Sequence, residues 1–277
     1  MVTHRWLLGG VAIVILGALV TLYLAILLLF WQGQWQLIFH PSNTVKATPA
    51  SLDLPWREVR FDAGETGRPR LTGWWIPAQP EPAPSRTVIL YMHDARGSLS
   101  DALPDLAALH ALGYSIFAFD PRGYGRSEWR RPSEYHWIQD GEAALAYLAS
   151  VRHVRAAQVL VAGRGLGATI AAELTARHRG LYRLVMIDPR PPTLPLLESP
   201  RWTRILPVRL LAADSFNPAD ALAAPGVRKI MLLPPATTPP GYLAGAAQPL
   251  TIVHATLGTP PAADALRGFL AQAAPAP

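Results

Sequence analysis

A glycine-rich segment is the first part of this sequence that could do chemistry. The run G-R-G-L-G-A at residues 163–168 follows an apolar stretch and precedes an amphipathic one. It matches the G-x-G-x-x-A turn whose backbone N–H groups bind the pyrophosphate of a dinucleotide. Asp188 lies 25 residues after Gly163, near the place of a ribose-binding acid. Dinucleotide binding is therefore one alternative, although such a turn opens its domain, whereas four strand-like stretches precede this one.

Other reactive residue types are missing or scattered. The 277 residues include no cysteine, which excludes thiol catalysis, Cys-ligated zinc, iron–sulfur clusters and disulfides. The eight histidines are dispersed, without H-x-x-x-H or H-E-x-x-H spacing, so we expect no metal and no cofactor. Ser127 and Thr169 could act as nucleophiles, but turn hydrogen bonding by Ser127 and helix packing by Thr169 are the simpler interpretations.

Strand-like and helix-like stretches alternate after residue 55. This alternation predicts an α/β fold, with a mostly parallel sheet covered by helices on both faces and a hairpin made by the first two strands. Residues 189–226 are rich in proline and have the size of a cap-like insertion over a site. The strand-like stretches are 57–61, 71–76, 87–92, 114–120, 158–162, 182–188, 229–233 and 250–253. The helix-like stretches are 99–112, 139–150, 166–178 and 262–271.

The run FDPRGYGRSEWRRPSEYHWIQDGEAALAYL at residues 119–148 resembles a known family. It is similar to the α/β-hydrolase fold, in the membrane-anchored branch of the BEM46, ABHD12 and ABHD13 type. There a strand ends in Asp before R-G-Y-G-x-S, a P-S-E element and an Asp-led helix. The matching residues are Asp120, Arg122–Gly125, Ser127, Pro132–Glu134, Asp140 and Tyr147–Leu148, with support from residues 39–42, 71–77 and 208–222. The resemblance covers residues 35 to about 270 and implies an α/β-hydrolase fold.

The resemblance also implies a catalytic site, and this sequence departs from it at each position. Such hydrolases need a Ser on a G-x-S-x-G elbow, an Asp after the seventh strand and a His after the eighth. Here Gly165 takes the Ser position, residues 234–238 hold no carboxylate, and His254 comes several residues early. The elbow would comprise Gly163, Arg164, Gly165, Leu166 and Gly167, and the oxyanion loop His93, Asp94, Ala95, Arg96 and Gly97.

Two physical arguments favour a retained fold without the chemistry, and we therefore expect no catalytic residue. An elbow residue is held in a strained conformation at a cost of about 1–3 kcal/mol, whereas glycine adopts such angles freely. Gly165 would thus keep the turn and relax it. Asp94 in the oxyanion loop has the wrong charge to stabilise a developing oxyanion.

The apolar run from Trp6 to Phe30 predicts a transmembrane helix. Its 25 residues carry no charge, and a helix of that length spans roughly 37 Å, enough to cross a bilayer core. No A-x-A cleavage site follows it, which favours a retained anchor over a signal peptide. Trp31 and Trp35 would lie in an interfacial aromatic belt. We expect an anchor at 1–31, a linker at 32–55, an α/β-hydrolase-like domain at 56–272 and a frayed tail at 273–277.

The charges around the apolar run predict its orientation. Arg5 precedes the run, and the next formal charge is that of Lys46. The positive-inside rule then leaves the N-terminus in the cytoplasm. The chain would be a single-pass protein of the inner (plasma) membrane, with its C-terminal domain in the periplasm or otherwise outside the cytoplasm.

The net charge of +6 does not point to nucleic acid. Only two of the 25 basic residues are lysines, and the arginines form no basic stripe with interleaved aromatics. A surface facing anionic lipid is the better interpretation. The residues Arg201, Trp202, Arg204 and Arg209 of the cap-like insertion could lie on a headgroup surface, although an ordinary cap helix is the simpler alternative.

The leading hypothesis is a catalytically inactive, membrane-anchored protein. Its domain would serve as a structural or interaction module, an accessory subunit beside another membrane protein or complex. One alternative is binding of a lipid or small apolar ligand in the vestigial acyl pocket, and another is a residual serine esterase with a non-standard nucleophile. An open apolar pocket between sheet and cap would favour ligand binding, and a filled one the structural role.

Overall fold

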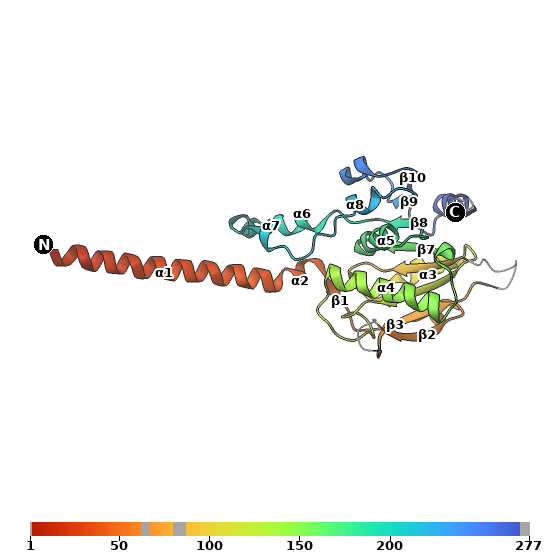
Figure 1. The fold of residues 1–277 in the computed structure, drawn as a ribbon, viewed down its shortest axis with the longest axis horizontal. Helices are drawn as coiled ribbons and strands as arrows, with labels where there is room; N and C mark the ends of the chain where they lie inside the picture. Colours follow the sequence, from red (N-terminus) through yellow and green to blue (C-terminus); the bar gives the residue numbers. More distant parts are fainter. Residues whose placement is uncertain (1, 63–66, 80–86, 272–277) are drawn as a thin grey trace.

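The protein consists of a long N-terminal helix and an α/β domain at its end. Figure 1 shows this computed structural model, which describes residues 2–62, 67–79 and 87–271. The predicted tail at 273–277 lies outside the described residues. Helix α1 (Val2–Gly33) projects away from the domain and continues past residue 31, the predicted end of the anchor.

The domain is built on a mixed sheet. Within the described ranges it has eight strands in the order β10-β9-β8-β7-β4-β6-β3-β2. The β2–β3 and β3–β6 pairs are antiparallel and the other five are parallel, which confirms the predicted hairpin and the mostly parallel sheet. The strands are β2 (Arg57–Asp62), β3 (Pro69–Ile76), β4 (Val88–Met92), β6 (Ser115–Asp120), β7 (Val159–Arg164), β8 (Arg183–Ile187), β9 (Arg228–Leu233) and β10 (Leu250–His254).

Helices cover both faces of this sheet. In β7, Val159 and Val161 face the apolar cluster that contains α4 and α5, while Leu160 and Ala162 face the cluster that contains α3 and α9. A parallel strand buried on both faces must be apolar on both, which explains the unbroken apolar runs of the sequence. The main helices are α3 (Leu103–His110), α4 (Glu134–Ser150), α5 (Leu166–Arg177) and α9 (Pro260–Ala271), and a 3-10 turn, η2 (Leu99–Ala102), precedes α3.

Helix α4 begins five residues before the predicted start at Gln139. The Ser133 hydroxyl accepts a hydrogen bond from the His136 N–H at 3.2 Å. This N-cap satisfies a donor that the first turn leaves unpaired and so fixes the start of the helix. The P-S-E element is therefore the N-terminus of α4.

Residues 32–55, which the sequence predicted to be a linker, pack on the domain. Helix α2 (Trp35–Ile38) leads into Phe39, which is 1% exposed and packs edge-on against Trp137 and Phe216. Strand β1 (His40–Pro41) then pairs in parallel with β5 (Arg96–Gly97). Because these apolar side chains are buried, α1 joins the domain through a folded segment, which continues into the 3-10 turn η1 (Pro49–Leu52).

The cap-like insertion extends along α1. The Tyr23 hydroxyl donates to the Ile205 carbonyl at 2.9 Å, and the Phe30 and Trp202 rings meet edge-on at 5.9 Å. The sequence predicted a cap over a site, whereas much of this insertion lies beside the N-terminal helix (Figure 1). Its elements are α6 (Thr193–Glu198), η4 (Arg201–Ile205), α7 (Val208–Leu211) and α8 (Ala219–Leu222); the 3-10 turns η3 (Ala156–Gln158) and η5 (Gly241–Gly245) lie elsewhere in the domain.

Helix α1 has the length and composition of a membrane span. Within the segment Leu8–Gly33, an 18-residue stretch has a mean hydropathy of 2.9, and only 6% of that stretch is buried against the rest of the protein. A water-soluble helix with so many exposed leucines and isoleucines would carry a large apolar surface, whereas lipid tails would cover it at no cost.

Candidate functional site

The turn between β7 and α5 has the geometry of a nucleophile elbow. Gly165 links the strand to the helix with φ 59° and ψ −122°, and its N–H donates to the Ile187 carbonyl at 3.1 Å. A positive φ is disfavoured for a residue with a side chain, which is why a Ser in this place would be strained. Gly165 holds the turn without that strain and supplies no nucleophilic atom.

The helix behind the turn approaches the sheet closely. A Cβ added to Gly167 would overlap the carbonyl oxygens of Met92 and His93 at the end of β4. Only glycine lets the first turn of α5 lie this near the neighbouring strand. The elbow is therefore held tightly in place by the same kind of close contact that a working site requires.

A carboxylate occupies the space in front of the elbow. The Leu166 N–H, the first donor after the turn, donates to Asp94 Oδ1 at 3.2 Å. A Cβ added to Gly165 would overlap the Asp94 carboxylate. In a serine hydrolase, the backbone N–H after the nucleophile is one of the two oxyanion donors. Here a resident anion takes that donor, at the positive end of α5.

Arg190 forms an ion pair with the Asp94 carboxylate. Its Nε lies 3.1 Å from Asp94 Oδ1 and its Nη2 lies 2.7 Å from Oδ2, which makes a bidentate ion pair. The Asp94 side chain is 18% exposed and that of Arg190 is 37% exposed. Two parallel charge-assisted hydrogen bonds fix the orientation of the carboxylate. The space in front of Gly165 thus holds a charged pair between protein side chains.

This pair also opposes dinucleotide binding. In a G-x-G-x-x-A turn, the pyrophosphate would take the helix N-terminus at which Asp94 is already bound. Asp188 follows the end of β8 with φ 43° and an exposed side chain. The elbow strand β7 is flanked by β4 and β8 in the middle of the sheet, and it does not open the domain.

Arg164 belongs to a separate ion-pair cluster. Its Nη2 donates to Asp105 Oδ1 at 2.7 Å, and Asp105 Oδ2 accepts from both Arg164 Nε and the Tyr91 hydroxyl. Burial and the adjacent Asp105 hold the pKa of Tyr91 well above its ordinary value. Burial alone would lower the pKa of Arg164, but the hydrogen bonds and charge of Asp105 raise it overall. Both groups therefore keep their protons at neutral pH.

The loop from His93 to Gly97 brings only Asp94 to the elbow. His93 is 3% exposed and packs edge-on against the Tyr124 and Trp137 rings. The Ala95 carbonyl accepts from the His40 N–H and from the Tyr124 hydroxyl, both at 2.9 Å. Arg96 and Gly97 form β5 against β1. Four of the five predicted loop residues therefore hold the fold.

The R-G-Y-G-R-S loop is also structural. Arg122 is 1% exposed, and its Nε donates to Asp140 Oδ1 at 2.6 Å, while its backbone N–H donates to Oδ2 at 2.8 Å. The Ser127 hydroxyl accepts from the Thr72 N–H and donates to the Asp120 carbonyl. The hydrogen bonds of the Ser127 hydroxyl therefore stabilise this turn. Thr169, the other candidate nucleophile, is fully buried in α5.

The two remaining triad positions follow β9 and β10 in the sheet. The run that follows β9 begins with Pro234 and Pro235 and carries no carboxylate up to residue 238. His254 is the last residue of β10 and its side chain is exposed. β10 is the third strand from β7, and three strand spacings are about 14 Å.

Arg190 is the residue of this site that sequence reasoning missed. It follows β8 by three residues, within the proline-rich run that begins the insertion. The carboxyl ends of parallel strands meet at one edge of a sheet, so a basic residue after β8 could have been paired with an acid after β4. The sequence signal for this ion pair was Asp94 in the predicted oxyanion loop, because a partly buried carboxylate is stabilised by a nearby cation.

Comparison with known proteins identifies the fold. A family model described as serine aminopeptidase, S33, matches residues 83–204. An uncharacterised protein of Mycobacterium tuberculosis is 28% identical over 240 residues, which are 81% of this chain and 79% of the relative. The protein bem46 of Schizosaccharomyces pombe is 31% identical over 115 residues, 41% of this chain and 38% of that protein. The resemblance to BEM46 is thus confirmed at low identity.

A solved structure shows the same architecture. An esterase of Pyrococcus furiosus superposes with a TM-score of 0.61 at 16% identity, over 84% of this chain and 96% of the esterase. At this identity the likeness concerns the fold and does not extend to activity. The chain therefore has the α/β-hydrolase fold that its sequence predicted, with an N-terminal apolar helix that is long enough to span a membrane.

Proposed function

We propose that this protein is a membrane-anchored α/β-hydrolase-fold protein without catalytic activity, whose domain serves as a structural or interaction module beside another membrane protein. One observation carries the proposal. The elbow turn is kept in detail, but it presents Gly165, and the Asp94–Arg190 pair occupies the space in which a substrate carbonyl would react.

The chemistry of acyl transfer explains why this arrangement supports inactivity. A serine hydrolase needs an oxygen nucleophile, a base to take its proton and donors for the oxyanion. Gly165 offers no such oxygen, and the Leu166 donor is taken by a carboxylate whose charge repels a developing oxyanion. Burial of an apolar ligand at the elbow is a poorer fit, because that ligand would have to displace a bidentate ion pair.

The chemical proposal is tested with the full-length protein in mild detergent. We expect no labelling by a serine-directed fluorophosphonate probe, and no hydrolysis of short p-nitrophenyl esters above the buffer rate. An Asp94→Ala variant should also be inactive, because opening the space supplies no nucleophile. Labelling of any Ser or Thr, located by peptide mass spectrometry, would support the alternative of an esterase with a non-standard nucleophile.

Membrane anchoring and orientation form the second part of the proposal. Helix α1 would cross the inner membrane with its N-terminus in the cytoplasm, which places the domain in the periplasm or otherwise outside. A reporter enzyme that is active only outside the cytoplasm, fused after Pro277, should then be active. Activity of a cytoplasm-specific reporter at the same position would show that Arg5 does not set the orientation.

A further inference from the structure

The tip of the cap-like insertion exposes large apolar side chains. We define the cap tip as residues 201–211, which include η4 and α7. Trp202 is 53% exposed, Ile205 64% and Leu210 87%. Thr203, Leu206 and Val208 alternate with them and are buried, so the tip is folded with its outer apolar residues held outward. An exposed apolar cluster of this kind marks an interaction surface.

The cap tip lies beside the part of α1 that would be in the membrane. Tyr23, which donates to the Ile205 carbonyl, comes ten residues before the end of α1 at Gly33. Ten residues of helix are about 15 Å, and the 26-residue apolar segment is about 39 Å long against a hydrocarbon core of about 30 Å. Ile205 would therefore lie several ångströms inside the hydrocarbon boundary. Its carbonyl is paired with the Tyr23 hydroxyl, as a backbone group in that environment requires.

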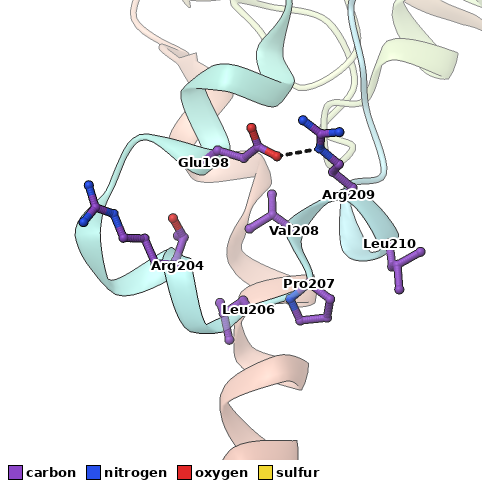
Figure 2. A pocket seen from close by; sticks show the side chains of 8 residues that line it. Glu198, Arg204, Leu206, Pro207, Val208, Arg209 and Leu210 are labelled. Carbon is purple, nitrogen blue, oxygen red and sulfur yellow. Dashed lines mark hydrogen bonds and ion pairs between the residues drawn. The ribbon is translucent and has the colours of Figure 1, made fainter.

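The same tip is basic. Residues 193–213 contain Arg201, Arg204, Arg209 and one acid, Glu198, which gives a net charge of +2. Arg209 Nε pairs with Glu198 at 2.9 Å, while Arg201 and Arg204 have no ion-pair partner among the residues that the structure describes. Figure 2 shows Arg204 pointing outward from the loop, with α1 passing beside the open pocket of about 400 Å³ that residues of this loop line. Arginines next to an apolar cluster fit the phosphates of anionic lipids.

A second segment repeats this composition where α1 enters the domain. Trp129 and Tyr135 are each 65% exposed. Arg131 Nη2 donates to the Trp31 carbonyl at 3.4 Å, and the guanidinium lies 5.9 Å from the centre of the Trp35 ring. Tryptophan, tyrosine and arginine are the residues that gather at a membrane–water boundary. Both segments therefore contact the end of α1 nearest the domain, Trp202 at Phe30 and Arg131 at Trp31.

We propose that the cap tip is embedded in the membrane, where Trp202, Ile205 and Leu210 enter the headgroup and upper acyl region and Arg201 and Arg204 bind the phosphates of anionic phospholipids. This inference rests on the proposed crossing of the membrane by α1 and is independent of whether the domain is catalytic. The occupant is the bilayer surface itself, because the apolar and basic side chains lie together beside a helix whose own surface must be covered by lipid.

A probe on the cap tip tests its position. Because the chain has no cysteine, Leu210→Cys provides a single labelling site for an environment-sensitive fluorophore on the full-length protein. The matched control is Val151→Cys, which is 58% exposed at the far end of α4. In vesicles of phosphatidylcholine and phosphatidylglycerol, a quencher on the upper acyl chain should quench the probe at position 210 and leave the one at 151 unquenched.

Lipid charge is tested with the quencher carried on one lipid at a time. Each arginine near an anionic surface contributes about 1 kcal/mol, about fivefold. Quenching at position 210 should therefore show at least a fivefold preference for labelled phosphatidylglycerol over labelled phosphatidylcholine. The double change Arg201→Gln and Arg204→Gln should bring the two lipids to parity. Arg179→Gln, beside the distal end of α4, is the control and should leave the preference unchanged.

Three outcomes would overturn the inference. A probe at 210 that stays as accessible to water as the one at 151, in protein that floats with the vesicles, would show that the tip is not in the membrane. Equal quenching by both lipids would show that the cap tip does not bind anionic headgroups selectively. Protection that rises with the protein-to-lipid ratio would identify a second copy of the chain as the occupant. Failure of the protein to float would instead contradict the proposed membrane crossing of α1.

Discussion

Two loops at the carboxyl end of the sheet differ in how their charges are used. After β6, Arg122 of the loop and Asp140 of α4 are 1% and 0% exposed and form a buried ion pair. At the elbow after β7, the Asp94–Arg190 pair is partly exposed, and the Asp94 carboxylate occupies the space beside Gly165. The first pair belongs to the residues that hold the fold, while the second lies at the turn where we propose that the chemistry is absent.

The difference shows that stability and catalysis make separate demands on one fold. A buried ion pair cannot lose one member without leaving an uncompensated charge in the interior. An elbow has no such requirement, because the turn needs only a residue that tolerates a positive φ. Loss of the nucleophile would therefore leave the fold intact, as proposed here.

The largest expected effect is at the buried pair. Asp140→Ala leaves Arg122 Nε and the Arg122 N–H without this carboxylate and should cost about 3–5 kcal/mol of unfolding free energy. Arg126→Ala is the control, because its pair with Glu58 is on the surface and should contribute less than about 1 kcal/mol. Urea unfolding of the full chain in detergent measures both. Equal losses would show that the R-G-Y-G loop is not anchored as described.

The next effect is at the elbow. Gly165→Ser places a side chain at φ 59° and against the Asp94 carboxylate, and should cost about 1 kcal/mol or more without creating esterase activity. Gly113→Ser is the matched control, because Gly113 also has a positive φ, of 90°, but open space around it. The loss at Gly165 should exceed the loss at Gly113. New esterase activity would mean that a base and an acid still reach the elbow.

A smaller effect separates the contact with Asp94 from the backbone strain. In an Asp94→Ala background, the cost of Gly165→Ser should fall by about 1 kcal/mol, because the overlapping carboxylate is gone. A double-mutant cycle of unfolding free energies measures this coupling. Strict additivity of the two changes would show that Asp94 does not occupy the space in front of the elbow.

The smallest effect concerns Asp214, a buried carboxylate whose pKa is raised. Burial raises the pKa of Asp214, and the charge of Glu134 adds to the rise, although the hydrogen bond from the Glu134 N–H opposes it. With a raised folded pKa, the native state binds the proton more tightly, so the contribution of Asp214 to stability is present at low pH. It is lost as pH rises above the ordinary range of an aspartate.

Asp214→Asn should therefore raise stability at neutral pH by less than about 1 kcal/mol, since the amide oxygen can still accept from the Glu134 N–H. The gain relative to the unmodified protein should disappear below pH 4. Paired unfolding curves at about pH 3 and 7 measure the difference. A loss of stability at neutral pH would show that the charge of Asp214 is needed.

Much of the fold follows from local patterns in the sequence. Each predicted strand coincides with an observed one to within two residues, because a buried parallel strand must be apolar on both faces. A sharp turn between β7 and α5 lies where the spacing of Gly163, Gly165 and Gly167 indicates that the chain turns and packs closely. The apolar run that becomes α1 was equally plain, since its length and composition are sufficient to cross a membrane.

Contacts between distant segments could not be read in the same way. Asp94 and Arg190 are 96 residues apart and meet only because β4 and β8 flank β7 in the sheet. In the sequence, residues 32–55 resemble a linker. In the structure, Phe39 of this segment packs against Trp137 and Phe216, which the sequence does not indicate. Tyr23 and Ile205 are 182 residues apart, and their hydrogen bond places the proline-rich insertion beside α1. Composition sets which residues must be buried, but only the packing of the elements against one another sets which partner each buried or charged group meets.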